Sequence, residues 1–158
     1  MANVKKLNEV SLNKGFNKFN EKVTERVTDR FGEEYEIEFS KYLKKTDTQK
    51  IMIDYMNIIE ELEDIEGINN LKDSIILPML MIKYFTNIPI QDEGEKLLIM
   101  ADKLIELELF GKIMDLLPED ELLKMTDVVE QFSKSVEKMV AEKEQVKVEA
   151  DVLGINKE

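Results

Sequence analysis

Hydrophobic and polar positions alternate strictly in one short stretch of the chain and follow helical spacing after it. Glutamates fill the polar positions of this stretch, and its apolar positions are Tyr35, Ile37 and Phe39. A period of two with aromatic and β-branched residues on one side predicts a half-buried strand. Such a strand needs a paired neighbour, which residues 23–31 can supply across a turn at Gly32. The apolar residues of that segment are Val23, Val27 and Phe31. Because they are four positions apart, this segment can also form a helix. The threonines and the need for a partner strand favour a hairpin.

The next apolar residues recur every three or four positions, which predicts helices. A capping box is expected at the start of the first helix, with the Thr46 hydroxyl covering an amide and Gln49 reaching back. Gly67 is expected to end this helix. The second helix contains the most apolar stretch of the chain, Ser74–Phe85. Pro78 within it predicts a kink or a new first turn. Because apolar residues lie on nearly every side, this helix is expected to be the enclosed, central one.

Two further helices are expected after the loop that follows this core helix. Asp92 and Glu95 are in positions to cap the third helix, and Gly111 is expected to break it. Pro118 and the three acidic residues after it are typical of a helix start, because proline fits the first turn and the helix dipole favours negative charge there.

The last helix has an apolar stripe with strict 3-4 spacing. Its members are Leu122, Met125, Val129, Phe132, Val136 and Met139. This spacing is that of a coiled-coil seam. The stripe either packs on the protein's own core or leaves a part free to bind a partner helix or a second copy. The residues nearest the C-terminus, Phe132, Val136 and Met139, are the candidate partner-binding residues, and Met79 and Met81 are the next candidates, since methionine adapts to differing partners.

These patterns together predict a mainly α fold, a compact helical domain of four to five helices with a small N-terminal β-hairpin. Residues 1–22 are polar and weakly patterned, and we expect a flexible N-terminal arm. Residues 23–140 are expected to form the single domain. Residues 141–158 are mainly charged and predict a tail or an extension of the last helix.

Composition restricts the chemistry that this protein can perform. The chain has 158 residues and a formal net charge of −12, which repels the phosphates of a nucleic acid. It has no cysteine and no histidine, which removes thiolate ligands, the usual zinc ligand and the commonest general base at neutral pH. The acidic segment 92–95 lacks the spacing of a calcium loop. We therefore expect no catalytic residues, no cofactor, no metal and no nucleic-acid partner.

The apolar stretch is too short to cross a membrane. It has nine residues without a charge before Lys83, whereas a spanning helix needs about 20 mostly apolar residues. The N-terminal residues have no apolar region typical of a signal peptide. We therefore expect a protein that remains in the cytoplasm and has no membrane partner.

Three motifs in a fixed order resemble a known group of proteins. The apolar helix ends in Tyr84-Phe85-Thr86-Asn87-Ile88, Leu109-Phe110-Gly111 follows, and Leu117-Pro118-Glu119-Asp120-Glu121 opens the last helix. Over roughly residues 33–140 this order resembles the tail assembly chaperones of phages and prophages of Gram-positive bacteria. The resemblance implies a non-catalytic protein of the bacterial host cytoplasm that binds the tape measure protein and helps recruit tail tube subunits, and self-association is also expected.

Two other functions fit the same sequence. One is a small structural neck or tail-completion protein, which would stay in the finished particle. The other is an acidic regulatory module that binds a basic partner, and its complexes would dissociate with added salt.

Overall fold

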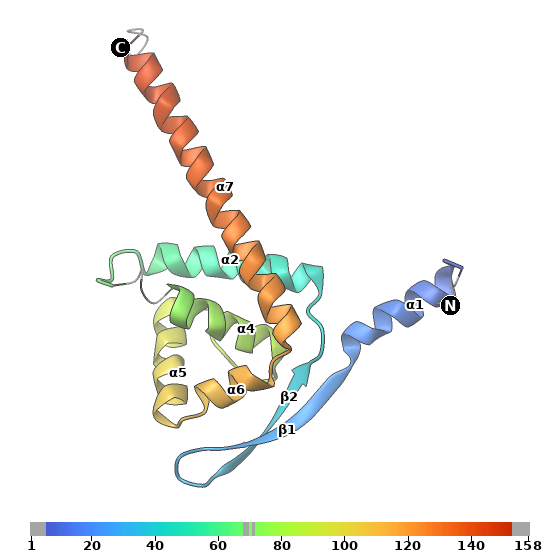
Figure 1. Ribbon diagram of the computed structural model, residues 1–158. Helices are drawn as coiled ribbons and strands as arrows, with labels where there is room; N and C mark the ends of the chain where they lie inside the picture. The colour runs from blue at the N-terminus through green and yellow to red at the C-terminus, as the bar shows by residue number, and fades with distance from the viewer. Residues whose placement is uncertain (1–5, 68–69, 71, 153–158) are drawn as a thin grey trace. The chain divides into compact units, whose positions relative to one another are not determined.

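The computed structural model describes residues 6–67, 70 and 72–152. The chain forms two compact units, residues 1–122 and residues 123–158, and each is described by itself. The first unit combines helices with a two-stranded antiparallel sheet (Figure 1), and most of the second is one long helix. The mainly α fold with a small N-terminal hairpin is therefore confirmed.

The elements follow one another with short connections. In chain order they are α1 (Glu9–Asn17), the 3₁₀ turn η1 (Lys18–Asn20), β1 (Lys22–Thr28), β2 (Glu34–Ser40), α2 (Lys45–Glu61), the π-helical turn η2 (Lys72–Ile76), α4 (Leu77–Phe85), α5 (Gly94–Glu106), α6 (Phe110–Leu116) and α7 (Glu119–Val152). The described residues thus contain six α-helices, one more than the sequence predicted, and α7 continues through the region expected to be a tail or helix extension. Residues 153–158 lie outside the described part.

The additional helix is α1, within the segment expected to be an N-terminal arm. The Asn8 side chain accepts a hydrogen bond from the Ser11 amide, and the Ser11 hydroxyl accepts one from the Asn8 amide, both at 2.9 Å. This reciprocal cap satisfies two amide groups at the helix start. No residue of α1 is buried, so local capping and not hydrophobic periodicity identifies this helix.

The hairpin forms as predicted, with β1 and β2 antiparallel and Val23 opposite Phe39. Ile37 and Phe39 are buried on its inner face. Phe31, which the sequence grouped with Val23 and Val27, instead lies in the turn and is 74% exposed. The Asp29 carboxylate accounts for this because it accepts hydrogen bonds from the amides of Phe31 and Glu33, at 2.8 and 3.0 Å, and so closes the turn around Gly32.

Helix α4 is the central element of the first unit, as its all-round apolar sequence predicted. Its buried residues are Leu77, Met79, Leu80, Met81, Ile82 and Phe85. α2 and α6 contact α4, and α5 contacts the turn η2 that precedes it; Figure 1 shows α4 between these helices. Pro78 lies in the first turn of α4, immediately after η2. The proline therefore lies where the π-helical turn gives way to α4, and the helical backbone continues through this junction at Ile76.

The boundaries of α2 differ from those predicted. The helix begins at Lys45, one residue before the expected capping box, and no side chain caps it. The Thr48 hydroxyl donates to the Lys44 carbonyl oxygen at 3.4 Å, within the first turn. The helix ends at Glu61, and Gly67 lies beyond it at φ +83°. The expected cap at Gly67 was therefore wrong, although its conformation is one that favours glycine.

The break after α5 is also not where the sequence placed it. α5 ends at Glu106, and the turn contains Glu108 at φ +56°, while Gly111 is inside α6. The Leu107 carbonyl oxygen accepts a hydrogen bond from the Arg30 amide at 3.1 Å. The hairpin turn, which is distant in sequence, thus supplies a hydrogen-bond donor to a carbonyl oxygen at the end of α5. Gly111 does not break this helix.

Candidate protein-binding surface

The long helix α7 carries the apolar stripe on which the sequence analysis placed a partner. Its start is fixed locally, because the Pro118 carbonyl oxygen accepts hydrogen bonds from the amides of Glu121 and Leu122, both at 3.0 Å. Three acidic residues occupy the first turn, where they interact favourably with the helix dipole. The Glu121 carboxylate also accepts a hydrogen bond from the Leu43 amide at 3.2 Å, which ties the helix start to the segment after the hairpin.

The C-terminal members of the stripe are more exposed than Met125 and Val129. Met125 and Val129 are buried, whereas Phe132 is 36% exposed and Met139 is 55% exposed. Val136, between them, is half-buried. Three apolar side chains on one side of a helix are therefore accessible at the C-terminal end of the predicted stripe.

Two lysines beside this part of α7 pair with glutamates of the same helix. Lys134 lies 3.5 Å from the Glu130 carboxylate, and Lys138 lies 4.0 Å from that of Glu142. Each is an i, i+4 pair, which stabilises an exposed helix by a few tenths of a kcal/mol, roughly 0.3–0.5. The Ser135 hydroxyl donates to the Gln131 carbonyl oxygen at 2.8 Å and so bonds within its own helix.

The other two candidate residues are not on the surface. Met79 and Met81 lie on α4 and are 0% and 4% exposed. Both fill the core of the first unit, so that a partner would reach them only if that unit opened. Their position differs from that of Met139 because α4 is covered on all sides.

A polar cluster joins α2, α4 and the loop before α5. The Lys83 ammonium donates to the Asp54 carboxylate at 2.6 Å and also to the Asp92 carboxylate, and the Tyr84 hydroxyl donates to Asp54 at 2.8 Å. Burial acts to lower the pKa of Lys83, but its hydrogen bonds to the two carboxylates outweigh this and raise it. Burial and then the hydrogen bond to Asp54 raise the pKa of Tyr84 to about 12. Neither group titrates near neutral pH, and the cluster fastens the three segments together.

Three residues of the motif at 84–88 hold the structure together. Phe85 is buried in the core, and the Thr86 hydroxyl donates to the Ile82 carbonyl oxygen at 2.7 Å and so closes the end of α4. Asn87 makes two hydrogen bonds to β2. Its backbone N–H donates to the Glu38 carbonyl oxygen, and its side-chain oxygen accepts from the Glu38 backbone N–H. This motif therefore attaches the hairpin to the central helix.

Sequence analysis missed a second exposed apolar surface, at the N-terminal end. Phe16 on α1 and Tyr42 after β2 are 59% and 41% exposed, and Phe19 in η1 lies between them. The sequence shows two aromatic residues before residue 22, but Phe16 lies in a helix and Phe19 in a 3₁₀ turn. The period of an α-helix alone therefore does not predict that they lie together.

The acidic side chains of the described residues do not gather into a group that could hold a metal ion. Within the acidic segment 92–95, Asp92 pairs with Lys83 and Glu93 with Lys96, and the Gly94 amide donates to Glu61. Among the described helices, none has the length and apolar character needed to cross a membrane.

Comparison with known proteins assigns a family. Comparisons with curated proteins and with solved structures gave no match. Residues 10–158 match the YomO family, which associates the chain with phages and Bacillus-type prophages. Because this match covers nearly the whole chain, from the second residue of α1 through α7, the protein belongs to the YomO family.

Proposed function

We propose that this protein is a non-catalytic phage tail assembly chaperone that binds the helical tape measure protein and helps recruit tail tube subunits. The proposed setting is the cytoplasm of the bacterial host. Membership of a phage-associated family supports this proposal, as does the resemblance of the three ordered motifs to such chaperones. The observation that carries it is the accessible end of the α7 stripe, Phe132, Val136 and Met139.

The stripe fits a helical client for a geometric reason. Residues 132 and 139 are seven positions apart, which corresponds to about 10 Å along a helix at 1.5 Å per residue. Side chains spaced three and four residues apart on one side are those that a partner helix contacts in a groove or a coiled coil. Methionine among them repacks against differing partners, because its side chain is unbranched and polarizable.

The test is co-purification of the tape measure protein with the double variant Val136→Ser/Met139→Ser. Both side chains are accessible, so the variant should unfold at nearly the wild-type temperature while client binding weakens by about tenfold or more, the usual effect of truncating central apolar contacts. Leu123→Ser is the matched control. Leu123 is an exposed apolar residue of the same helix on another side, and its replacement should leave binding unchanged.

Four results would contradict the proposal. Unchanged client binding by the double variant would place the contact elsewhere, and loss of binding in the Leu123→Ser control would show a general effect on the helix. Recovery of the protein in purified phage particles in fixed proportion would favour a structural neck or tail-completion protein. Release of the partner by moderate salt would favour the acidic regulatory module, because an apolar contact is less sensitive to screening.

A further inference from the structure

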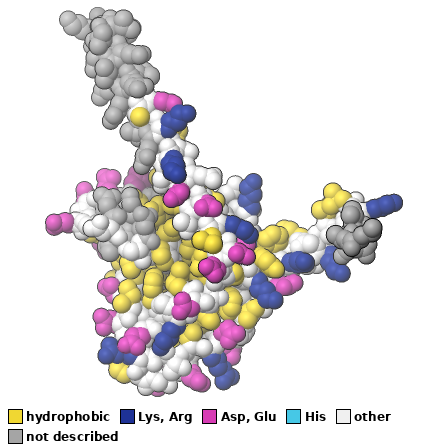
Figure 2. Space-filling view, in the orientation of Figure 1, with side chains coloured by type: hydrophobic (Ala, Val, Ile, Leu, Met, Phe, Trp, Pro, Cys, Tyr) yellow, Lys and Arg dark blue, Asp and Glu magenta, His cyan; other side chains and the backbone are white. Residues whose placement is uncertain are grey.

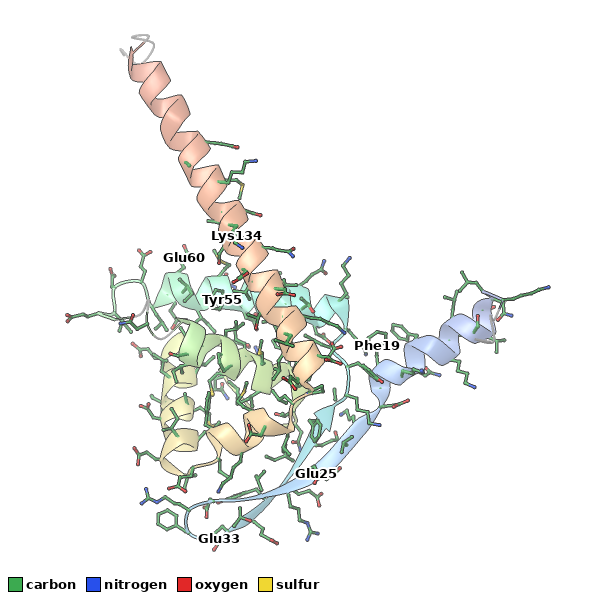
Figure 3. The ribbon with its side chains drawn as sticks, in the orientation of Figure 1. Phe19, Glu25, Glu33, Tyr55, Glu60 and Lys134 are labelled. Carbon is green, nitrogen blue, oxygen red and sulfur yellow. The ribbon has the colours of Figure 1, made fainter. Side chains whose placement is uncertain are left out.

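The N-terminal end of the first unit presents an exposed cluster of aromatic rings. The ring centres of Phe16 and Phe19 are 6.0 Å apart, and those of Phe19 and Tyr42 are 6.3 Å apart. The Lys44 ammonium lies 5.7 Å from the centre of the Phe16 ring, and Leu12 is exposed one helical turn before Phe16. We call these five residues the aromatic-lysine surface. In Figure 3, Phe19 lies where the N-terminal helical segment meets the hairpin.

This surface is basic in a chain that is otherwise strongly acidic. Residues 6–20 contain three lysines and one glutamate, and residues 41–45 contain three lysines and no acidic residue. Figure 2 shows basic side chains, in dark blue, along the N-terminal helix. α1 buries none of its own residues, so that more than half of the surface of Leu12 and Phe16 stays accessible.

The first unit also carries a surface of the opposite character, on α2. Its apolar members are the exposed Ile53 and Met56, 59% and 40% accessible, and the half-buried Met52 and Ile59. Glu60 is exposed on the same side of the helix, and Figure 3 shows it pointing away from the other helices of the first unit. Residues 51–66 contain six acidic residues and no lysine or arginine. We call the five named residues the α2 strip.

We propose that the aromatic-lysine surface of one copy binds the α2 strip of a second copy of this chain. Both surfaces expose large apolar side chains, and their charges are opposite, which favours association and fixes its orientation. Rigid aromatic rings are typical anchors of an interface, and methionine and isoleucine provide an adaptable counterpart. Because the two surfaces differ, the contact is heterologous and joins copies head to tail, in a closed ring or pair or in a longer assembly.

The apolar side chains of the α2 strip decide between a second copy and a nucleic acid as the occupant. Aromatic rings with nearby lysines can also stack on the bases of a single strand. The net charge of −12 opposes the approach of a phosphate backbone and of a second copy alike, but the α2 strip adds exposed Ile53 and Met56 beside its acidic residue, which a phosphate backbone lacks.

The experiment is sedimentation velocity of the full chain over a wide range of concentration, without any client. The double variants Phe16→Ser/Tyr42→Ser and Ile53→Ser/Met56→Ser each remove one surface and change only exposed residues. Each should weaken self-association by about tenfold or more. The matched control Phe31→Ser removes an exposed aromatic residue at the hairpin turn and should associate as the wild type does.

Mixing the two double variants is the decisive step. One retains an intact α2 strip and the other an intact aromatic-lysine surface, so the mixture should regain one wild-type contact and form a heterodimer. Raising the salt concentration should weaken association in the wild type, because the contact includes opposite charges. Client binding by Phe16→Ser/Tyr42→Ser should be unchanged, since the stripe on α7 is intact.

Several outcomes would overturn this inference without bearing on the proposed chaperone function. They are a monomeric mass at every concentration, double variants that associate like the wild type, or a mixture that fails to associate. Loss of association only on replacing Phe132 and Met139 would place the contact between copies on α7. Retention of a single-stranded oligonucleotide by the wild type, and its loss in Phe16→Ser/Tyr42→Ser, would assign the surface to nucleic acid.

Discussion

Replacing Gly94 with alanine should destabilise the first unit, although alanine is the better helix former. A Cβ atom at this position would lie 2.8, 2.9 and 3.0 Å from Cγ, Cδ1 and Cδ2 of Leu62. Leu62 is 1% exposed and therefore has little room to move. The Gly94 amide also donates to the Glu61 carboxylate at 2.9 Å, which holds the start of α5 against the end of α2.

The expected magnitude follows from two opposing effects. Inserting a methyl group into a packed core costs about 1–3 kcal/mol, and exchanging glycine for alanine in a helix contributes up to about 1 kcal/mol of stability. The free energy of unfolding should therefore fall by roughly 1–2 kcal/mol on these two magnitudes. Gly111→Ala is the matched control, because Gly111 lies in α6 and its added Cβ would meet nothing within 4 Å. That variant should be more stable by about 0.5–1 kcal/mol.

A double-mutant cycle identifies the cause. Leu62→Ala alone should cost about 2–5 kcal/mol, as large-to-small changes in a core do, and it deletes the three atoms that the new methyl group would meet. In that background Gly94→Ala should be neutral or stabilising. The coupling between the two substitutions should therefore exceed about 1 kcal/mol, well above the few tenths expected for independent sites.

Urea unfolding followed by circular dichroism at a helical wavelength supplies the free energies for this cycle. A clash between the added methyl group and Leu62 is excluded if Gly94→Ala is as stabilising as Gly111→Ala, or if the effects of Gly94→Ala and Leu62→Ala add. Equal stability of Gly94→Ala and the wild type, together with additivity, would show that α2 and α5 are not in contact at this point.

Three more results are expected from the packing and the charges of the first unit. Leu80→Ala should lower the free energy of unfolding by about 2–5 kcal/mol, because Leu80 is fully buried in α4; a near-wild-type urea midpoint would mean that α4 is not central. The pKa of Lys83 is raised in the folded state, so its contribution to stability is complete below the ordinary pKa of 10.5 and is lost as the pH rises through the folded value. Lys83→Met should therefore flatten the alkaline loss of stability in thermal unfolding, and an unchanged slope would argue against the ion pairs. Burial acts to raise the pKa of Asp29, but hydrogen bonds from the amides of Glu33 and Phe31 and from the Tyr35 hydroxyl outweigh it and hold this pKa below 3.8. Its contribution is present above that ordinary value and is lost as the pH falls through the folded one, so Asp29→Asn should reduce the acid sensitivity measured by thermal unfolding, and equal sensitivity would contradict this role.

Both the sequence and the tertiary structure are needed to identify the candidate surface on α7. The 3-4 spacing up to Met139 was visible in the sequence. The methionines of α4, which were also candidates for partner binding, are buried in the core. Burial separates Met79 from Met139, and burial depends on how many elements surround a helix. The aromatic-lysine surface was missed because Tyr42 joins Phe16 and Phe19 only when the chain after β2 returns beside η1.

Local regularities were sufficient for the hairpin, the central helix and the start of α7. The cause of each lies within a few residues: the alternation around Ile37, the all-round apolar sequence of α4, and the proline before α7 with the acidic residues of its first turn. Where a helix ends, and whether a glycine is required at a position, depended on contacts with residues far away in sequence. α5 ends where the Leu107 carbonyl meets the hairpin turn, and Gly94 is needed because Leu62 lies against it, while Gly111 has open space. The sequence alone determined the helical and extended segments after residue 22, because their periodicity is local, whereas α1 lacks such a pattern and was not expected. The tertiary structure decided which apolar side chains are covered, because only the packed neighbours of a residue set its burial.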